Sequence, residues 1–223
     1  MYHIEALVED SSGGVILDGL LRSVLSERNT KWTYAIRRHR GIGKLPDDWD
    51  VDPPRFASGL LHLLPAKMRV YNRVYKAEDR NIIIVALDTD YRDPNALFRD
   101  LANIRRKYAE SLTVVIGIAV EEVEAWLLGD REALLQAYPN INQNVLNRYE
   151  QDSVVGTWEV LARAILGSRA SHLIKAGYPA VGTYKFKLAE AVSPHLDAKR
   201  NISPSFQSFR NYLLKCMDEL EEG

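Results

Sequence analysis

The chain has 223 residues, of which 46% are hydrophobic and 26% are charged, and its formal net charge is −1. This balance is typical of a folded globular protein and argues against a disordered chain or a uniformly basic nucleic-acid coat. Cys216 is the only cysteine, which excludes a disulfide framework and a cysteine-based zinc site, so we expect a reducing, cytoplasmic environment.

Strand and helix patterns alternate through the first half of the chain. Strands are expected at 3–9, 32–38, 80–88 and 112–120, and helices at 14–28, 54–77 and 94–110. Ser11 or Ser12 is a candidate cap of the first helix, and Pro65 should kink or restart the second. Charges within the first apolar stretch argue against a signal peptide or a membrane span, so we expect no membrane association.

The second half of the chain reads as helical from residue 121 onward. Ser203 is a candidate cap of the last helix, and Pro204 suits its first position. The near-continuous apolar runs of the third and fourth strands favour an α/β fold, with a mostly parallel sheet of at least four strands flanked by helices. We expect one domain, 1–223, made of an α/β core at 1–130 and a helical C-terminal extension at 131–223.

Acidic residues follow three of the predicted strands. They are Glu9, then Asp88 and Asp90, then Glu121 and Glu124. Because ligands of open α/β sheets bind beyond the carboxyl ends of the strands, we expect these acids to converge. A strand extended through residue 90 would turn Asp88 and Asp90 to one side, and a spacing of three would put Glu121 and Glu124 on one helical face. Alternatively, single acids are solvated or cap helices, as Asp90 or Asp93 could for the helix at 94.

Converging carboxylates need positive charge between them, and hard divalent cations such as Mg²⁺ or Mn²⁺ are the natural choice. The expected catalytic residues are Glu9, Asp88, Asp90 and Glu124, and the expected metal ligands are these four and Glu121. With such an ion, the site would be suited to phosphoryl transfer on a phosphodiester.

Positive charge is concentrated between residues 31 and 80, which contain eleven Lys or Arg and six Asp or Glu. Within this region the segment RRHRGIGK lies in a glycine-containing loop, where a backbone can approach phosphate closely. Its candidate nucleic-acid-binding residues are Arg37, Arg38, Arg40 and Lys44, and the alternative is a solvated basic loop. Lys185 is a candidate transition-state lysine, although most lysines on helices are solvated. We expect Trp126 to belong to the core.

Four segments carry a resemblance to known families: LVED, LDTD, AVEEVEAWLLGD and NISPSFQSFRNYL. The first two resemble the Toprim domain of topoisomerases, primases and nucleases of the overcoming-lysogenization-defect type. Together, the four are similar to a bacterial family, domain of unknown function 4276, which is treated as Toprim-like and often linked to phage defence. The resemblance implies that Glu9 is the Toprim glutamate, that Asp88 and Asp90 are its paired aspartates, and that Glu124 is the acid after the fourth strand.

The acids and the resemblance together predict a Mg²⁺- or Mn²⁺-dependent nuclease, or a related phosphoryl-transfer enzyme, acting on DNA or RNA. One alternative is a phosphoacceptor receiver domain, but its later strands should supply a hydroxyl residue and a lysine, whereas here the fourth strand leads into VEEVE. The other is a non-catalytic binding or regulatory module that works with a partner ATPase or nuclease. The sequence leaves this second alternative open.

Overall fold

The computed structural model describes residues 1–76, 78–153 and 156–222. Its centre is a sheet of four parallel strands in the order β2-β1-β3-β4. The strands are β1 (Tyr2–Val8), β2 (Trp32–Arg38), β3 (Asn81–Asp88) and β4 (Thr113–Ala119). The prediction of an α/β fold with a parallel sheet of at least four strands is confirmed.

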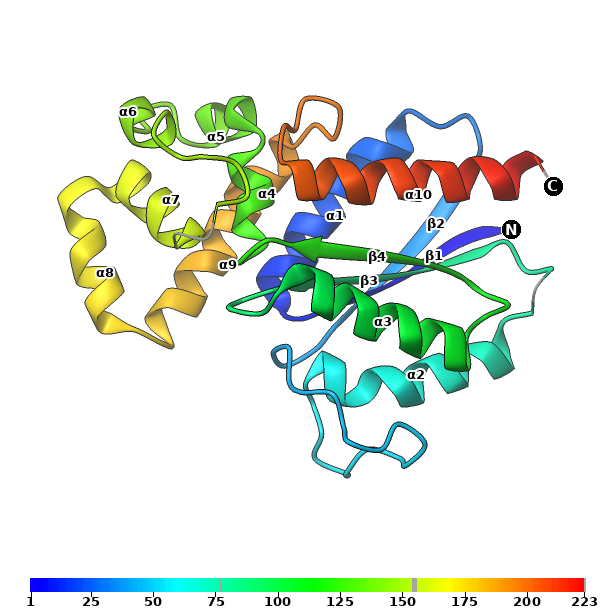
Figure 1. Ribbon diagram of the computed structural model, residues 1–223. Coiled ribbons are helices and arrows are strands. Elements are labelled where there is room, and N and C mark those ends of the chain that lie inside the picture. Colours follow the sequence, from blue (N-terminus) through cyan, green and yellow to red (C-terminus); the bar gives the residue numbers. More distant parts are fainter. Residues whose placement is uncertain (77, 154–155, 223) are drawn as a thin grey trace.

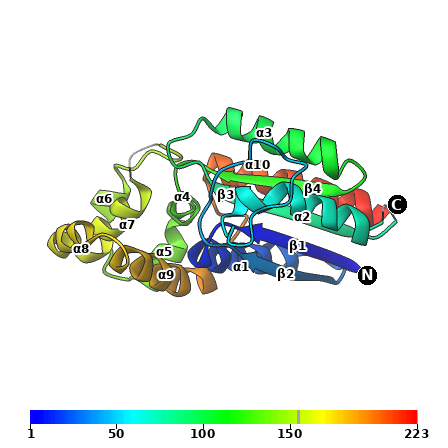
Figure 2. The ribbon, with the colours of Figure 1, turned by 90° about the horizontal axis from the view of Figure 1, so that it is seen from below.

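Helices cover both faces of the sheet (Figures 1 and 2). One face packs against α1 (Ser11–Ser26) and α10 (Pro204–Glu222), and the other against α2 (Leu60–Val74) and α3 (Pro94–Tyr108). The period of two along β1 sends Ile4 and Ala6 into the first layer and Leu7 into the second. Because both faces are covered, the strands can be apolar along almost their whole length.

The order of the strands creates a switch point in the middle of the sheet. The chain passes from β1 through α1 to β2 on one side, and later returns through α2 to β3 on the other side of β1. Right-handed crossovers in opposite directions place α1 and α2 on opposite faces. The carboxyl ends of β1 and β3 therefore lie side by side where the connections diverge, which is the usual ligand position in open parallel sheets.

The helical extension lies beyond the carboxyl ends of the strands (Figure 1). Its helices are α4 (Glu124–Leu128), α5 (Arg131–Ala137), α6 (Gln143–Leu146), α7 (Thr157–Leu166), α8 (Ala170–Ala176) and α9 (Ala180–Val192), with 3₁₀ turns at Gly167–Arg169 and Ser193–His195. The chain then returns, and α10 packs along β4. The last helix thus completes one layer of the α/β core, although it belongs to the part of the chain that was expected to form an extension.

Three local details test the predicted helix boundaries. Asp10 caps α1 by accepting a hydrogen bond from the Gly13 backbone N–H at 2.7 Å, so the prediction of a serine cap was wrong. Helix α2 begins at Leu60, not near residue 54, and continues past Pro65 without a restart. The predicted cap of α10 is confirmed, because the Ser203 hydroxyl accepts a hydrogen bond from the Phe206 N–H at 3.2 Å.

Within the described part of the chain, none of the helices combines the length and the apolar character needed to span a bilayer.

Candidate functional site

Two carboxylates meet at the switch point. Asp88 is the last residue of β3, and Glu9 directly follows the neighbouring strand β1. Both line a small pocket that Asp10 and Trp126 also contact. The Glu9 Oε2 atom is buried and has no hydrogen-bond partner among the described residues. The structure thus brings together two of the acids that the sequence singled out.

Glu124 supplies a third carboxylate from the first turn of α4. Its side chain is 0% exposed, and its Oε2 atom lies 3.2 Å from the Lys185 Nζ. This ion pair is not a well-aligned hydrogen bond, and within the described residues neither Glu124 oxygen has a hydrogen-bond partner. Lys185 comes from α9, is itself buried, and donates a hydrogen bond to Glu122 Oε1 at 3.0 Å. We call Glu9, Asp88, Glu122 and Glu124 with Lys185 the acidic cluster.

The carboxylates of the acidic cluster are short of positive charge. Burial raises the pKa of Glu9 to about 7, and the charges of Asp90 and Asp10 add to this rise. Burial also raises the pKa of Glu124 to about 7 despite the nearby Lys185 ammonium. The pKa of Asp88 is raised well above its ordinary value, first by burial and then by Glu9 and Glu124.

Lys185 remains charged in these surroundings. Burial by itself would lower its pKa, but the negative charges of Glu124, Glu122 and Asp88 reverse that effect and raise the pKa above its ordinary value. Among the described residues, Lys185 is thus the one cation set against the four carboxylates of the cluster. This imbalance makes the cluster suited to taking up a further cation or protons.

The expectation that the strand extends through residue 90 and turns Asp88 and Asp90 to one side was wrong. Strand β3 ends at Asp88, and Asp90 has a left-handed backbone conformation with φ 49°. Its carboxylate pairs with Arg92 at 3.3 Å and is partly exposed. Asp90 nevertheless remains close enough to Glu9 for its charge to raise the pKa of Glu9. It lies at the rim of the cluster.

Glu121 binds the backbone at the start of α7. Its carboxylate accepts hydrogen bonds from the backbone N–H groups of Gly156 and Thr157, at 2.6 and 2.8 Å, where α7 begins. With φ 65°, Glu121 precedes α4 and shares no helical face with Glu124, contrary to the sequence-based expectation. Glu122, which the prediction left out, contacts Lys185 instead. The run EEVE signalled an acid-rich strand exit but not which acid would turn inward.

Two of the candidate nucleic-acid-binding residues, Arg37 and Arg38, differ in their surroundings. Arg37 and Arg38 are consecutive in β2, so their side chains point in opposite directions. The Arg37 Nε donates to the buried carboxylate of Glu5 at 2.7 Å, and the Tyr71 hydroxyl donates to the same oxygen at 3.0 Å. Arg38 instead lies over the first turn of α1, where a Cβ on Gly14 would stand 2.7 Å from its Nε. Arg37 is thus held by a structural ion pair, whereas Arg38 forms no ion pair with any described residue.

A shallow basic depression flanks the acidic cluster. Its lining includes Arg37, whose Nε is bound to Glu5, together with Arg38, His39, Arg40 and Lys67. The loop that carries His39 and Arg40 is fastened to the end of β1, because the His39 N–H donates to the Val8 carbonyl and the Gly41 N–H to the Glu9 carbonyl, both at 3.1 Å. Lys44 is exposed farther along the same loop. The sequence did not single out Lys67, which reaches this surface from α2.

Trp126 anchors the segment that carries Glu124. Its ring stacks on Phe209 at a centroid distance of 5.4 Å and an interplanar angle of 10°, and its indole Nε1 donates to the Ser205 hydroxyl at 3.0 Å. Two distant sequence segments, EAWLLGD and SPSFQSFR, therefore pack against each other. The expectation that Trp126 belongs to the core is confirmed.

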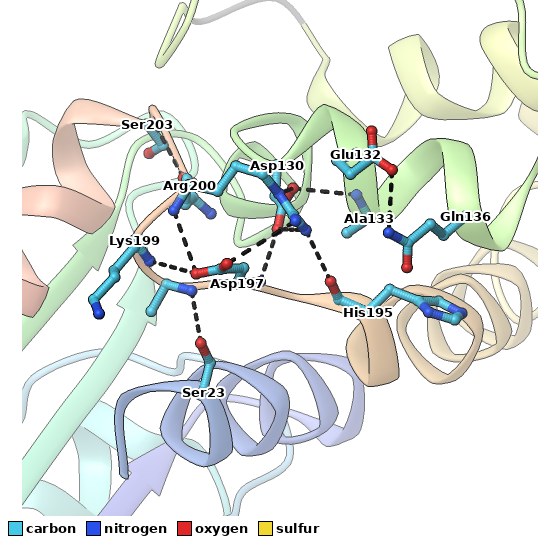
Figure 3. Close-up of polar contacts among 12 residues, drawn as sticks. Ser23, Asp130, Glu132, Ala133, Gln136, His195, Asp197, Lys199, Arg200 and Ser203 are labelled. Atoms are coloured by element: carbon cyan, nitrogen blue, oxygen red, sulfur yellow. Dashed lines mark hydrogen bonds and ion pairs between the residues drawn. The ribbon is translucent and has the colours of Figure 1, made fainter. Parts of the chain in front are cut away.

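Asp130 fastens the extension to the chain that leads into α10 (Figure 3). Its buried carboxylate accepts hydrogen bonds from the backbone N–H groups of Ala133 and Asp197, and from the Arg200 guanidinium at 2.8 and 3.0 Å. Nearby, the Ala198 N–H donates to the Ser23 hydroxyl of α1 at 2.8 Å. These bonds tie the segment after α9 to both α5 and α1, which helps to hold Lys185 in place.

The cluster is not a preassembled metal cage. Across residues 1–76, 78–153 and 156–222, no group of three or more His, Cys, Asp or Glu side chains is already arranged to hold a metal ion. The buried oxygens without partners on Glu9 and Glu124 are nevertheless the hard donors that Mg²⁺ and Mn²⁺ prefer. The donor chemistry fits such an ion, provided that side chains rotate toward it.

Comparison with known proteins identifies the family. The search of curated proteins and the search of solved structures each found no match. The model of one family, described as a domain of unknown function (DUF4276), matches residues 8–214. This match includes the ends of all four strands, the acidic cluster and most of α10. The chain belongs to the DUF4276 family.

Proposed function

We propose that this protein is a Mg²⁺- or Mn²⁺-dependent phosphodiesterase that acts on nucleic acid. The observation that carries this proposal is the meeting of Glu9, Asp88 and Glu124 at the switch point of a parallel sheet, where Glu9 and Glu124 have buried oxygens without a hydrogen-bond partner among the described residues. Carboxylates are costly to bury without a counter-charge or hydrogen bonds, so such a cluster is typical of a site that receives a cation.

Glu9, Asp88 and Glu124 would hold the ion, with Asp90 at the rim. When bound, a divalent ion of this kind stabilises negative charge on a phosphoryl group and lowers the pKa of a coordinated water. Lys185 keeps its positive charge in the site and would stabilise an anionic phosphate at close range. Arg38 and Arg40 of the basic depression would neutralise neighbouring phosphates of the chain.

The same proposal includes a relationship to the Toprim domain and a role in phage defence. The parallel sheet, with an acid after β1 and another at the end of β3, supports the first. The second depends on family resemblance alone. The single cysteine supports a reducing compartment for this activity.

Asp88→Asn tests the proposal because it removes one charge while almost preserving the shape of the side chain. Cleavage of labelled single- and double-stranded DNA and RNA is measured with Mn²⁺ or Mg²⁺ and with chelator, beside thermal melts in the same buffers. We expect metal-dependent cleavage and a metal-dependent rise in melting temperature for the parent protein, and loss of both in Asp88→Asn.

Asp100→Asn is the matched control, because Asp100 is exposed on α3 and away from the cluster. It should behave like the parent protein. Cleavage that survives both Asp88→Asn and chelation would refute the metal mechanism.

A second candidate function is a non-catalytic module that works with a partner ATPase or nuclease. The ion pairs of Lys185 with Glu122 and Glu124 favour it, because an internal cation already neutralises part of the cluster. A parent protein that neither cleaves nucleic acid nor gains thermal stability with metal would support this function over the first.

A further inference from the structure

Tyr178 is an exposed aromatic residue next to the acidic cluster. Its side chain is 74% exposed, although it lies just before α9, the helix that buries Lys185. The ring rests on the first turn of that helix, since a Cβ on Gly182 would stand 3.3 and 3.4 Å from two of its carbon atoms. Gly182 and Lys185 are three positions apart in α9 and share one side of it, so the ring that contacts Gly182 lies on the side of the helix that carries Lys185.

The electrostatic surroundings of Tyr178 agree with this placement. Its pKa is raised first by burial of part of the ring, lowered by Lys185, and raised by the charges of Glu122, Glu124 and Asp10. The phenol therefore stands within the field of the acidic cluster. The absence of a side chain at Gly182 lets the ring lie close to the helix, while its exposure leaves the remaining surface open to solvent.

The rim of the cluster at the end of β1 is basic, and the nearby end of β3 leads to an exposed aromatic side chain. The basic depression with Arg38 and Arg40 flanks the end of β1. Tyr91, which is 97% exposed, directly follows Asp90. A ligand at the acidic cluster would thus have cations and the exposed rings of Tyr91 and Tyr178 around it.

We infer that the site takes a single nucleic-acid strand, and that Tyr178 stacks on an unpaired base of that strand next to the phosphate held at the acidic cluster. An aromatic ring can stack only on a base whose face is free, and bases inside a duplex are covered by their neighbours. Stacking tolerates any base because every base has a flat π face. This inference rests on the proposed function and specifies its substrate class.

The test is a binding measurement with Ca²⁺ in place of Mg²⁺ or Mn²⁺, because Ca²⁺ also binds carboxylates and supplies the positive charge that a phosphate needs, and the probes are checked afterwards to be uncut. The probes are a fluorescein-labelled DNA strand of mixed sequence, about 16 nucleotides long, and the duplex of the same sequence. The proteins are the full-length parent and the variants Tyr178→Ala, Tyr178→Phe and Tyr212→Ala. Tyr212 is the matched control because it is partly exposed on α10, outside the acidic cluster.

We expect Tyr178→Ala to weaken binding of the single strand by about 5- to 150-fold, the loss associated with one base–aromatic stack. Tyr178→Phe keeps the ring and should bind within about twofold of the parent, as should Tyr212→Ala. The duplex should bind more weakly than the strand and respond little to Tyr178→Ala.

Two results would overturn the inference in distinguishable ways. A parent protein that binds neither probe would remove both the inference and the proposed nucleic-acid substrate. A parent that binds, but whose affinity is unchanged in Tyr178→Ala or falls equally for strand and duplex, would remove the single-strand assignment alone and leave the proposed phosphodiesterase standing.

Discussion

Glu124→Gln should flatten the pH dependence of folding stability. The substitution removes a carboxyl group that is 0% exposed while almost preserving its shape. In the folded protein the pKa of Glu124 is about 7, compared with an ordinary value of 4.5. Between these two values the folded state holds a proton that the unfolded state has released, so the stabilisation is complete at low pH and is lost as the pH rises through about 7.

Proton linkage sets the size of the effect. For one carboxyl group with these two pKa values, raising the pH from about 5 to about 8 lowers the free energy of unfolding by about 2.5 kcal/mol. For a chain of this size, that loss corresponds to about 5–10 °C in melting temperature. Glu124→Gln removes this contribution, and it also weakens the repulsion that helps to raise the pKa of Asp88. Both effects make the variant less sensitive to pH than the parent.

The assay is urea denaturation in metal-free buffer at several pH values, for the parent, Glu124→Gln and the control Glu110→Gln. Glu110 is exposed at the end of α3, so its variant should follow the parent. The parent should lose about 2.5 kcal/mol more than Glu124→Gln between about pH 5 and about pH 8. A difference below about 1 kcal/mol would refute the claim that burial dominates the ionisation of Glu124.

Three further predictions concern the internal cation, the core and the basic surface. Lys185→Met should lower the free energy of unfolding in metal-free buffer by about 3 kcal/mol, because it leaves buried carboxylates without their counter-charge. The control Lys187→Met, at an exposed position, should leave the free energy of unfolding unchanged. Equal stability of the two variants in urea denaturation would contradict this prediction. Trp126→Ala should cost about 3–5 kcal/mol in the same assay, and a loss below about 1 kcal/mol would show that its stacking contributes little. Arg38→Ala should reduce the salt dependence of nucleic-acid affinity by about one unit of slope. Arg37→Ala should change this slope less, because the Arg37 side chain is bound to a buried carboxylate. Equal slopes for the two variants would contradict the different roles assigned to Arg37 and Arg38.

Local patterns in the sequence were sufficient for the fold class and for part of the site. The apolar run of β3 ends at Asp88, and Glu9 follows β1, so both acids could be placed at strand ends from periodicity alone. Their meeting required that parallel strands end at the same edge of the sheet and also that β1 and β3 be neighbours, which the strand order supplies. The cap of α10 by Ser203 was also readable, because capping depends on residues a few positions apart.

Other features depended on backbone conformation or on contacts between distant segments. Left-handed residues at Asp90 and Glu121 changed the direction of side chains that an extended or helical backbone would have aligned. The pairing of Lys185 with Glu122 joins groups 63 positions apart, and the pairing of Arg37 with Glu5 depends on the register of two neighbouring strands. The sequence by itself determined which strands end in acids, because that is a matter of local pattern. Only the tertiary structure decided which acids share a buried site with a cation, because ionic contacts form wherever packing brings side chains together, whatever their separation along the chain.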